Sequence, residues 1–335
     1  KKVTDDLLRK KMKVPSSTGL STVAWYNSGK IQNKGWEFNI DIAAVKTKDW
    51  SFNFGFNISQ NKNEILELPE NKNDELYTFG NKNYAYSVMM GDPLGSFYGY
   101  RYKGVYQNVE ETYAVNTSGQ RILDIDGNPV VMKNGDQKVY PGDARYEDVN
   151  GDGVIDENDI VYLGNSNPTL TGGLNFTLRY KKVSLVAAFH GRAGQKVINQ
   201  ARMDMENMRG KNNQSVAVLR RWRSEGDDTD IPRALYDKGY NYLGSDRFVE
   251  DASFLRLKTV TLKYQMPAKW MKAIGVNKLE LYATGYDMFV WTKYKGQDPE
   301  VNLKAANDGT VAQVAIDSNN TPKPFKIAFG LNLNF

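Results

Sequence analysis

The stretch Phe325-Lys326-Ile327-Ala328-Phe329-Gly330-Leu331-Asn332-Leu333-Asn334-Phe335 decides the fold of this chain. Large apolar residues occupy every second position, and mostly small or polar residues lie between them. A period of two is typical of a β-strand with one apolar face and one polar face, and about ten residues suffice for a tilted strand to cross a bilayer. We therefore predict that this stretch is the closing strand of an outer-membrane β-barrel.

The same alternation recurs upstream, which favours a barrel over one amphipathic strand in a soluble sandwich. Apolar residues take every second position in 36–42, 52–58, 174–180 and 183–189. Short polar turns at 47–49 and 181–182 join these runs into hairpins. In 254–264 the alternation is irregular, and two explanations stay open: a β-bulge, or a wet patch on the strand.

Composition agrees with a barrel. The mean hydropathy is -0.59, and the chain has no apolar run near the 18 residues that a membrane helix needs. Barrel strands need only every second residue apolar, so the polar average does not exclude a membrane. Tyr, Phe and Trp make up 12% of the residues, which suits aromatic girdles at the two membrane interfaces, although a sugar-binding surface would be enriched in the same residues.

Several classes of function are disfavoured by composition. The chain contains no cysteine, which removes disulfides, thiol catalysis and thiolate metal sites. Its single histidine, His190, has no nucleophile motif nearby, so we expect no Ser-His-Asp triad and no enzyme. The net charge of +5 comes from interspersed acidic and basic residues, so nucleic acid is not an expected partner.

We predict an all-β chain of about nine antiparallel strands that belongs to one transmembrane barrel. Short turns are expected in the periplasm and long polar loops outside the cell, at about 63–80, 107–165, 191–250 and 291–323. The start, Lys1-Lys2-Val3-Thr4, is not a signal peptide, so we expect residues 1–335 to be the C-terminal part of a longer chain. The expected strands run near 36–46, 50–61, 81–90, 95–106, 168–180, 183–191, 250–266, 277–290 and 324–335.

Four sequence blocks together resemble a known family. They are NSGKIQNKGWE at 27–37, GDPLGSFYGY at 91–100, RFVEDASFLRLK at 247–258 and TKYKGQDPE at 292–300. In this order they are similar to successive motifs of the SusC/RagA-type TonB-linked outer-membrane transporters of Bacteroidota. The resemblance covers nearly the whole chain.

The resemblance implies a 22-stranded barrel in the outer membrane, of which this chain is the C-terminal portion. It also implies a plug and N-terminal domains, which are absent from this chain, TonB as the energy-coupling partner, and a SusD-like surface lipoprotein as a lid. The implied function is TonB-dependent active import of a nutrient, either an oligosaccharide or a peptide. A passive porin or a surface adhesin remains the alternative, because both share amphipathic strands.

One candidate metal site is visible in the loop 148–159. Its spacing matches a calcium loop, with side-chain oxygens at positions 1, 3 and 5, a glycine at 6, a carbonyl at 7 and a carboxylate at 12. We expect one structural Ca²⁺, with Mg²⁺ as the alternative. Asp159 is shorter than the usual Glu, so bidentate ligation is in doubt, and a solvated Asp/Asn/Gly turn is the competing explanation. The expected ligands are Asp148, Asn150, Asp152, the carbonyl of Val154, Asp156 and Asp159.

Overall fold

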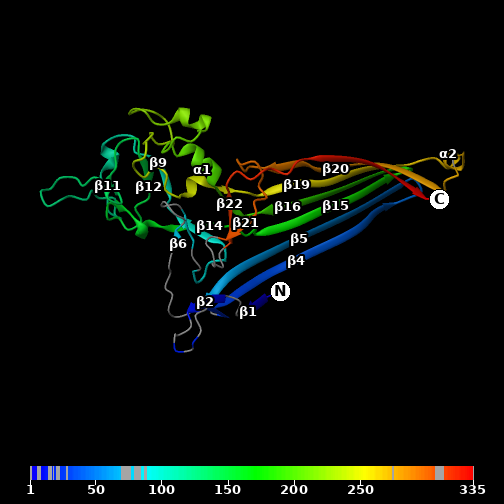
Figure 1. Cartoon of the computed structure of the whole chain (residues 1–335), viewed down its shortest axis with the longest axis horizontal. Coiled ribbons are helices and arrows are strands. Elements are labelled where there is room, and N and C mark those ends of the chain that lie inside the picture. Colours follow the sequence, from blue (N-terminus) through cyan, green and yellow to red (C-terminus); the bar gives the residue numbers. More distant parts are fainter. Residues whose placement is uncertain are drawn as a thin grey trace.

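The computed structural model places long strands side by side, with a group of folded loops at one end and short turns at the other (Figure 1). It describes residues 2–5, 9–13, 17, 19, 23–27, 29–68, 77–78, 84–86, 89–273, 275–305 and 313–334.

The long strands form one antiparallel sheet, here called the wall. Its order among the described residues is β1-β4-β5-β15-β16-β19-β20-β23. The strands are β1 (Lys2–Asp5), β4 (Lys30–Lys46), β5 (Trp50–Glu67), β15 (Leu170–Tyr180), β16 (Val183–Ala193), β19 (Phe254–Gln265), β20 (Lys278–Thr292) and β23 (Lys326–Asn334).

Tight turns join neighbouring wall strands at one end. Thr47 donates its backbone N–H to the carbonyl of Trp50 at 2.8 Å and closes the β4–β5 turn. The β15–β16 turn is only Lys181-Lys182, and Lys181 adopts φ 52°, as two-residue hairpins require. The turn between β19 and β20 holds helix α2 (Ala268–Ala273). These three turns lie at the same end of the wall, as the sequence predicted (Figure 1).

The expected strands at 81–90 and 95–106 are not part of the wall. β5 pairs directly with β15, so the whole excursion from 68 to 169 leaves and returns on one side. The described residues of the two expected strands instead form short strands among the loops. All four residues of β8 (Ser96–Gly99) are buried, whereas a wall strand would expose one face to lipid. The wall therefore has seven long strands beside the short β1.

The loops fold into small sheets and helices, here called the loop assembly. Four hydrophobic core clusters lie among its described residues, and the two largest are one around Phe97, Ile198 and Phe248 and one around Tyr106, Tyr146 and Leu243. Its strands are β6 (Tyr77–Thr78), β7 (Ala85–Tyr86), β8, β9 (Tyr102–Val105), β10 (Lys133–Asn134), β11 (Gln137–Lys138), β12 (Ala144–Tyr146), β13 (Val154–Ile155), β14 (Val161–Asn165), β17 (Lys196–Asn199), β18 (Val249–Asp251), β21 (Leu303–Ala305) and β22 (Gln313–Asp317).

The remaining elements are short. Strands β2 and β3 pair with each other, apart from the wall. Their bounds, and those of the other helices, are β2 (Arg9–Lys13), β3 (Val23–Asn27), α1 (Gln200–Glu206), and the 3-10 helices η2 (Glu110–Thr112), η3 (Glu157–Asp159), η4 (Val216–Arg220) and η5 (Asp246–Phe248). No helix in the described part of the chain is long and apolar enough to span a bilayer.

A β-bulge interrupts the wall where the sequence pattern is irregular. Register shifts occur between Leu257 and Thr259 of β19 against both neighbouring strands. The bulged residue is Lys258, whose Nζ lies 3.2 Å from Oδ1 of Asp287 on β20. Asp287 itself has φ 49°, so the backbone of β20 is also irregular at this level. Of the two explanations left open for 254–264, the bulge is therefore present, and it places a charge on the inner face.

Candidate functional site

The outer face of the wall is apolar across all seven long strands. One row of paired residues runs through Ile40, Phe56, Leu174, Phe189, Leu257 and Phe289. Many side chains on this face are exposed, including Trp36 at 47%, Phe289 at 58% and Phe329 at 82%. A continuous exposed apolar face of this extent is far larger than a soluble protein presents to water, so it is a candidate lipid-facing surface.

Aromatic residues lie at both ends of this outer face. Near the short turns, the rings of Trp50 and Tyr180 are 4.3 Å apart, and near the loop assembly the ring of Trp291 lies 6.3 Å from that of Phe189. Through the strand register, Trp50 is level with Tyr180 of β15 and Trp291 is level with Gly172, so eight residue steps separate the two levels. At about 3.3 Å per residue and a tilt of about 40°, these steps cover roughly 20 Å of membrane depth, most of the apolar band of about 25 Å in outer-membrane barrels.

The inner face of β4, β5 and β15 carries amides and hydroxyls. Asn61 and Asn63 both donate to Oδ1 of Asn33, at 3.2 and 2.9 Å. The hydroxyls of Ser59 and Thr171 are hydrogen-bonded at 2.7 Å across β5 and β15. These cross-strand pairs satisfy polar groups that would be costly in lipid, so this face belongs on the aqueous side of the wall.

A charged cluster lies on the inner face where β19 and β20 meet the loop assembly. Arg256, which is buried, contacts Oδ1 of Asp298 at 2.6 Å and Oε2 of Glu300 at 2.9 Å. Glu300 also accepts from Lys258 at 3.3 Å and Lys323 at 2.6 Å. Burial acts to raise the pKa of Glu300, but these three cations outweigh it and hold the pKa below its ordinary value. The cluster ties the loop after β20 to the wall.

A second buried cluster joins α1 to the segment that leads into β19. Glu250 accepts from Arg202 at 3.0 Å and from the backbone N–H of Lys295 at 2.9 Å. Glu206 binds both Arg202 at 2.9 Å and Arg247 at 3.0 Å. Sequence reasoning missed both clusters. The available signal was the charge of Arg256 and Lys258 beside the apolar residues Phe254, Leu255 and Leu257.

Two of the four sequence blocks that carry the family resemblance, the third and the fourth, meet in these clusters. Arg256 and Glu250 come from the third block, and Asp298, Glu300 and Lys295 come from the fourth. The second block forms a turn against β5, where Asp92 accepts from the hydroxyl of its own Tyr98 at 2.6 Å and its backbone carbonyl accepts from the backbone N–H of Ile65 at 3.0 Å. The blocks are therefore contact points between loops and wall.

The predicted calcium ligands lie in one compact loop of the loop assembly. Asp148 accepts from the backbone N–H of Gly151 and of Gly153, each at 2.8 Å. Asp152 accepts from the backbone N–H of Val154 at 2.8 Å and from the side chain of Asn150 at 2.9 Å. The loop thus brings together the residues at positions 1, 3, 5, 6 and 7 of the predicted site.

The last two predicted ligands are engaged elsewhere in the same loop. Asp156 caps η3 by accepting from the backbone N–H of Asn158 at 2.8 Å. Asp159 is fully buried and accepts from Val149 at 2.8 Å and Asp156 at 2.9 Å. Burial, with a contribution from Asp148, raises the pKa of Asp159 despite those hydrogen bonds. Among the described residues no group of three or more acidic or histidine side chains is arranged to hold a metal ion.

Comparison with known proteins agrees with this arrangement. A TonB-dependent receptor of Formosa agariphila is 33% identical over 340 residues, which span 100% of this chain and 32% of that receptor. The TonB-dependent receptor SusC of Bacteroides thetaiotaomicron is 27% identical over 343 residues, which span 99% of this chain and 29% of SusC. No family model matches the chain.

Among solved structures, the RagAB peptide importer in its closed-closed state matches with a TM-score of 0.70 and 23% identity, over 100% of this chain and 33% of that chain. A second structure of the RagAB peptide transporter matches with a TM-score of 0.68 and 24% identity, over 96% of this chain and 31% of that chain. At these identities the match shows the fold alone.

Fold, wall and relatives together define a class: this chain is part of a transmembrane antiparallel β-barrel, and the relatives that it matches are receptors and transporters. The sequence resemblance to the SusC/RagA-type TonB-linked transporters is confirmed in the same way, since the whole chain aligns with TonB-dependent receptors, SusC among them, at 27–33% identity. It spans about a third of the length of the relatives it matches.

Proposed function

We propose that this chain forms part of the wall and the extracellular loops of an importer in the outer membrane, which takes up a nutrient when TonB supplies energy. The observation that carries this proposal is the two-faced wall. Its outer face offers apolar side chains to lipid, and its inner face offers amides, hydroxyls and charges to an aqueous passage. The similarity to TonB-dependent receptors supports energised import over passive diffusion.

The cargo is an oligosaccharide or a peptide, and a SusD-like surface lipoprotein covers the loop assembly. The names of the relatives support both halves of this proposal, because one is SusC and another is a peptide importer. The loop assembly offers a folded platform for such a partner, since four hydrophobic clusters and two buried ionic clusters fix the shape of its described part. The partner and the cargo would meet at the open end of the wall.

Uptake by cells that carry the full-length gene tests this function. Fluorescent oligosaccharides and peptides would be offered to cells with the gene, cells without it, and cells with the gene plus a protonophore. We expect uptake that requires both the gene and the proton gradient. Uptake that ignores the protonophore, with ion conductance of the purified protein in planar bilayers, would establish the porin alternative. Surface adhesion with neither uptake nor conductance would establish an adhesin.

The loop 148–159 is proposed to bind a structural Ca²⁺, with Mg²⁺ as the alternative ion. The supporting observation is that Asp148, Asn150 and Asp152 already surround one turn with Gly153 at its sharp point. The buried carboxyl of Asp159 adds a reason, because a nearby cation would favour its ionised form. Terbium luminescence, excited through nearby tyrosines in the full-length protein and competed by Ca²⁺ or Mg²⁺, tests binding and identifies the preferred ion.

A further inference from the structure

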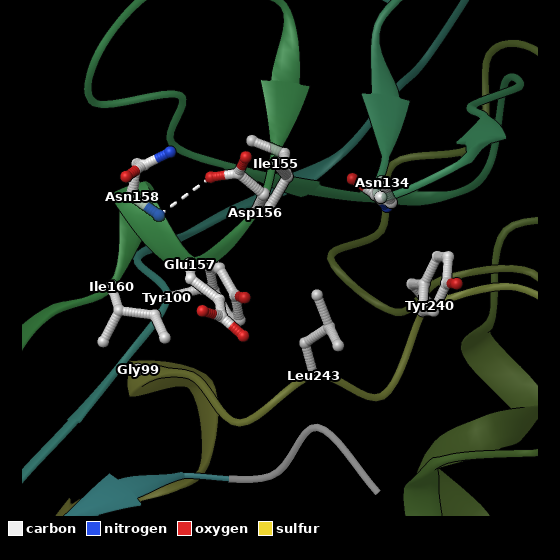
Figure 2. Close-up of a pocket in the computed structure, with 11 residues that line it drawn as sticks. Gly99, Tyr100, Asn134, Ile155, Asp156, Glu157, Asn158, Ile160, Tyr240 and Leu243 are labelled. Atoms are coloured by element: carbon white, nitrogen blue, oxygen red, sulfur yellow. Dashed lines mark hydrogen bonds between the residues drawn. The ribbon is translucent and has the colours of Figure 1, made fainter. Parts of the chain in front are cut away.

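The loop assembly contains a pocket that lies apart from the wall and shares only Asp156 with the predicted calcium ligands. Its volume is about 480 Å³, and it opens beside the second core cluster. Figure 2 shows residues from four separate segments around it. They are Gly99, Tyr100, Asn134, Gly135, Ile155, Asp156, Glu157, Asn158, Ile160, Tyr240 and Leu243.

A buried acceptor without a partner lies in the pocket lining. Asn134 is only 4% exposed, and its Oδ1 makes no hydrogen bond within the described part of the chain. Figure 2 shows this oxygen on the side of Asn134 that is nearer to Asp156. A buried carbonyl oxygen without a hydrogen bond destabilises the fold, so a donor from a bound ligand would remove an existing penalty.

The pocket is also negatively charged. Asp156 and Glu157 both line it, and none of its lining residues is basic. Neither carboxylate forms an ion pair with another described residue, and the one hydrogen bond drawn in Figure 2 runs from the backbone N–H of Asn158 to Oδ1 of Asp156 at 2.8 Å. Burial and the neighbouring carboxylates raise the pKa of Tyr100 to about 12. These observations favour a ligand that carries positive charge and hydrogen-bond donors.

The remaining lining suits an organic cation better than a bare metal ion. Ile155, Ile160 and Leu243 supply apolar surface for a methylene chain. The ring of Tyr240 is held in place because its hydroxyl donates to Oδ1 of Asp136 at 2.9 Å, and aromatic faces attract ammonium and guanidinium groups. Calcium and magnesium prefer six or more oxygen ligands without apolar neighbours.

We propose that this pocket binds an alkylammonium or guanidinium group, the chemistry of a lysine or arginine side chain. The methylene stem lies along Leu243 and Ile160, and the charged end donates to Asn134 Oδ1 and the two carboxylates. Such a group can come from a peptide cargo or from a protein that docks on the loop assembly. Only the cargo source rests on the proposed import function, because binding to the purified protein does not require transport.

Calorimetry with full-length protein in detergent and a chelator of divalent cations tests the pocket. The probes are the Nα-acetyl amides of lysine, arginine and norleucine, which differ in the charged group. We expect the lysine and arginine probes to bind and the neutral norleucine probe to bind at least about tenfold more weakly, as for a desolvated charge pair. Equal binding of norleucine, no binding of any probe, or tighter binding of a neutral oligosaccharide would overturn the proposal.

Three variants locate the binding. Glu157→Gln removes one carboxylate at an exposed position and should weaken the binding of both cationic probes about tenfold. Asn134→Asp adds a negative charge on a side chain of the same shape as asparagine and should tighten their binding. Glu225→Gln is the matched control, because it makes the same change at an exposed loop residue that does not line the pocket. Equal effects of Glu157→Gln and Glu225→Gln would show that only net charge matters and would reject the site.

The source of the cation is decided by repeating the titration on the complex with its surface lipoprotein. If a partner side chain fills the pocket, the lysine probe should bind at least about tenfold more weakly to the complex than to the isolated chain. If the cargo supplies the cation, probe affinity should be unchanged in the complex, and lysine-containing peptides should compete with the probe. Probe binding to the complex that no such peptide displaces would contradict the cargo source.

Discussion

Arg256 of β19 and Asp298 of the loop after β20 form a 2.6 Å ion pair whose side chains are only 3% and 10% exposed. The pair joins two sequence blocks that are 42 residues apart and fixes the final loop against the inner face of the wall. The same arginine also contacts the second buried carboxylate of the cluster, Glu300, so removing it leaves Asp298 with no cation among the described residues, while Glu300 keeps Lys258 and Lys323. This buried ion pair therefore holds the loop against the wall, and losing the arginine removes that contact completely.

We expect Arg256→Ala to cost about 3–5 kcal/mol locally, because it leaves the buried carboxylate of Asp298 without that cation and removes one of the three cations around Glu300. Lys30→Ala, which breaks an exposed 2.8 Å pair with Glu67, should cost no more than about 1 kcal/mol. Hydrogen exchange of the full-length protein would measure both through the amides of Lys295 and Glu300. Unchanged protection of these amides in Arg256→Ala would show that the cluster does not hold the loop.

The facing of β23 gives a second prediction. Phe329→Arg places a charge on the outer face near mid-bilayer and should destabilise the barrel by about 2–4 kcal/mol. Asn332→Arg puts the same side chain on the opposite face, where Oε1 of Glu280 lies 3.3 Å from the present amide, and should be nearly neutral. Urea unfolding of the full-length protein in lipid vesicles compares the two variants. A larger loss for Asn332→Arg would invert the assignment of the faces.

Gly99 gives a third prediction, in the loop assembly. A Cβ at this position would lie 2.4 Å from the carbonyl oxygen of Gly244, and the neighbouring amide of Tyr100 donates to that oxygen at 2.9 Å. Gly99→Ala must push these two backbone segments apart, so we expect about 1–3 kcal/mol of lost stability and faster exchange of the Tyr100 amide. Gly210→Ala, where a Cβ would meet no atom within 4 Å, is the control and should leave exchange unchanged.

The raised pKa of Asp159 makes the proposed calcium site dependent on pH. A carboxyl with a raised folded-state pKa stabilises the fold below its ordinary pKa and loses that contribution as pH rises through the raised value. Bound Ca²⁺ should restore stability on the alkaline side, and its affinity should fall as acidification protonates Asp159. Terbium titrations at several pH values would check this.

Two variants control the calcium prediction. Asp152→Ala should weaken terbium binding by about tenfold or more, because it removes a side-chain ligand. Asp126→Ala changes a carboxylate in another exposed turn, 124–128, and should have no effect. Affinity that is independent of both pH and Asp152 would leave the loop as a solvated turn.

The wall could be predicted from the sequence because its signal is local. Phe52, Phe54 and Phe56 show the period of two within one strand, and the two-residue turn at 181–182 fixes the neighbouring register. The strand expected at 95–106 was wrong for the opposite reason. Tyr98 and Tyr100 alternate as they would in a wall strand, but both are buried by distant segments, with Tyr98 packed on Tyr162 of β14.

The candidate sites divide in the same way. The loop 148–159 is contiguous, so spacing alone predicted which residues share its turn. The ionic clusters and the pocket of Figure 2 combine residues from segments far apart in the chain, such as Asn134 with Tyr240. The sequence showed that the strand of Arg256 carries charge, but only the folded loops show which carboxylates pair with Arg256.

The bulge at Lys258 has a consequence for how this strand can change. Before the bulge, the odd-numbered residues Leu255 and Leu257 lie on the outer face. After it, the even-numbered residues Val260 and Leu262 lie on the same face. The bulge therefore shifts the alternation of the two faces by one residue, and Lys258 is the extra residue. Deleting Lys258 would remove the bulge and leave Leu255, Leu257, Val260 and Leu262 in one unbroken alternation, but the contacts of Lys258 with Asp287 and Glu300 would be lost. Adding residues to the loops would leave the wall intact. In β19 the spacing of the residues is as informative as their identity.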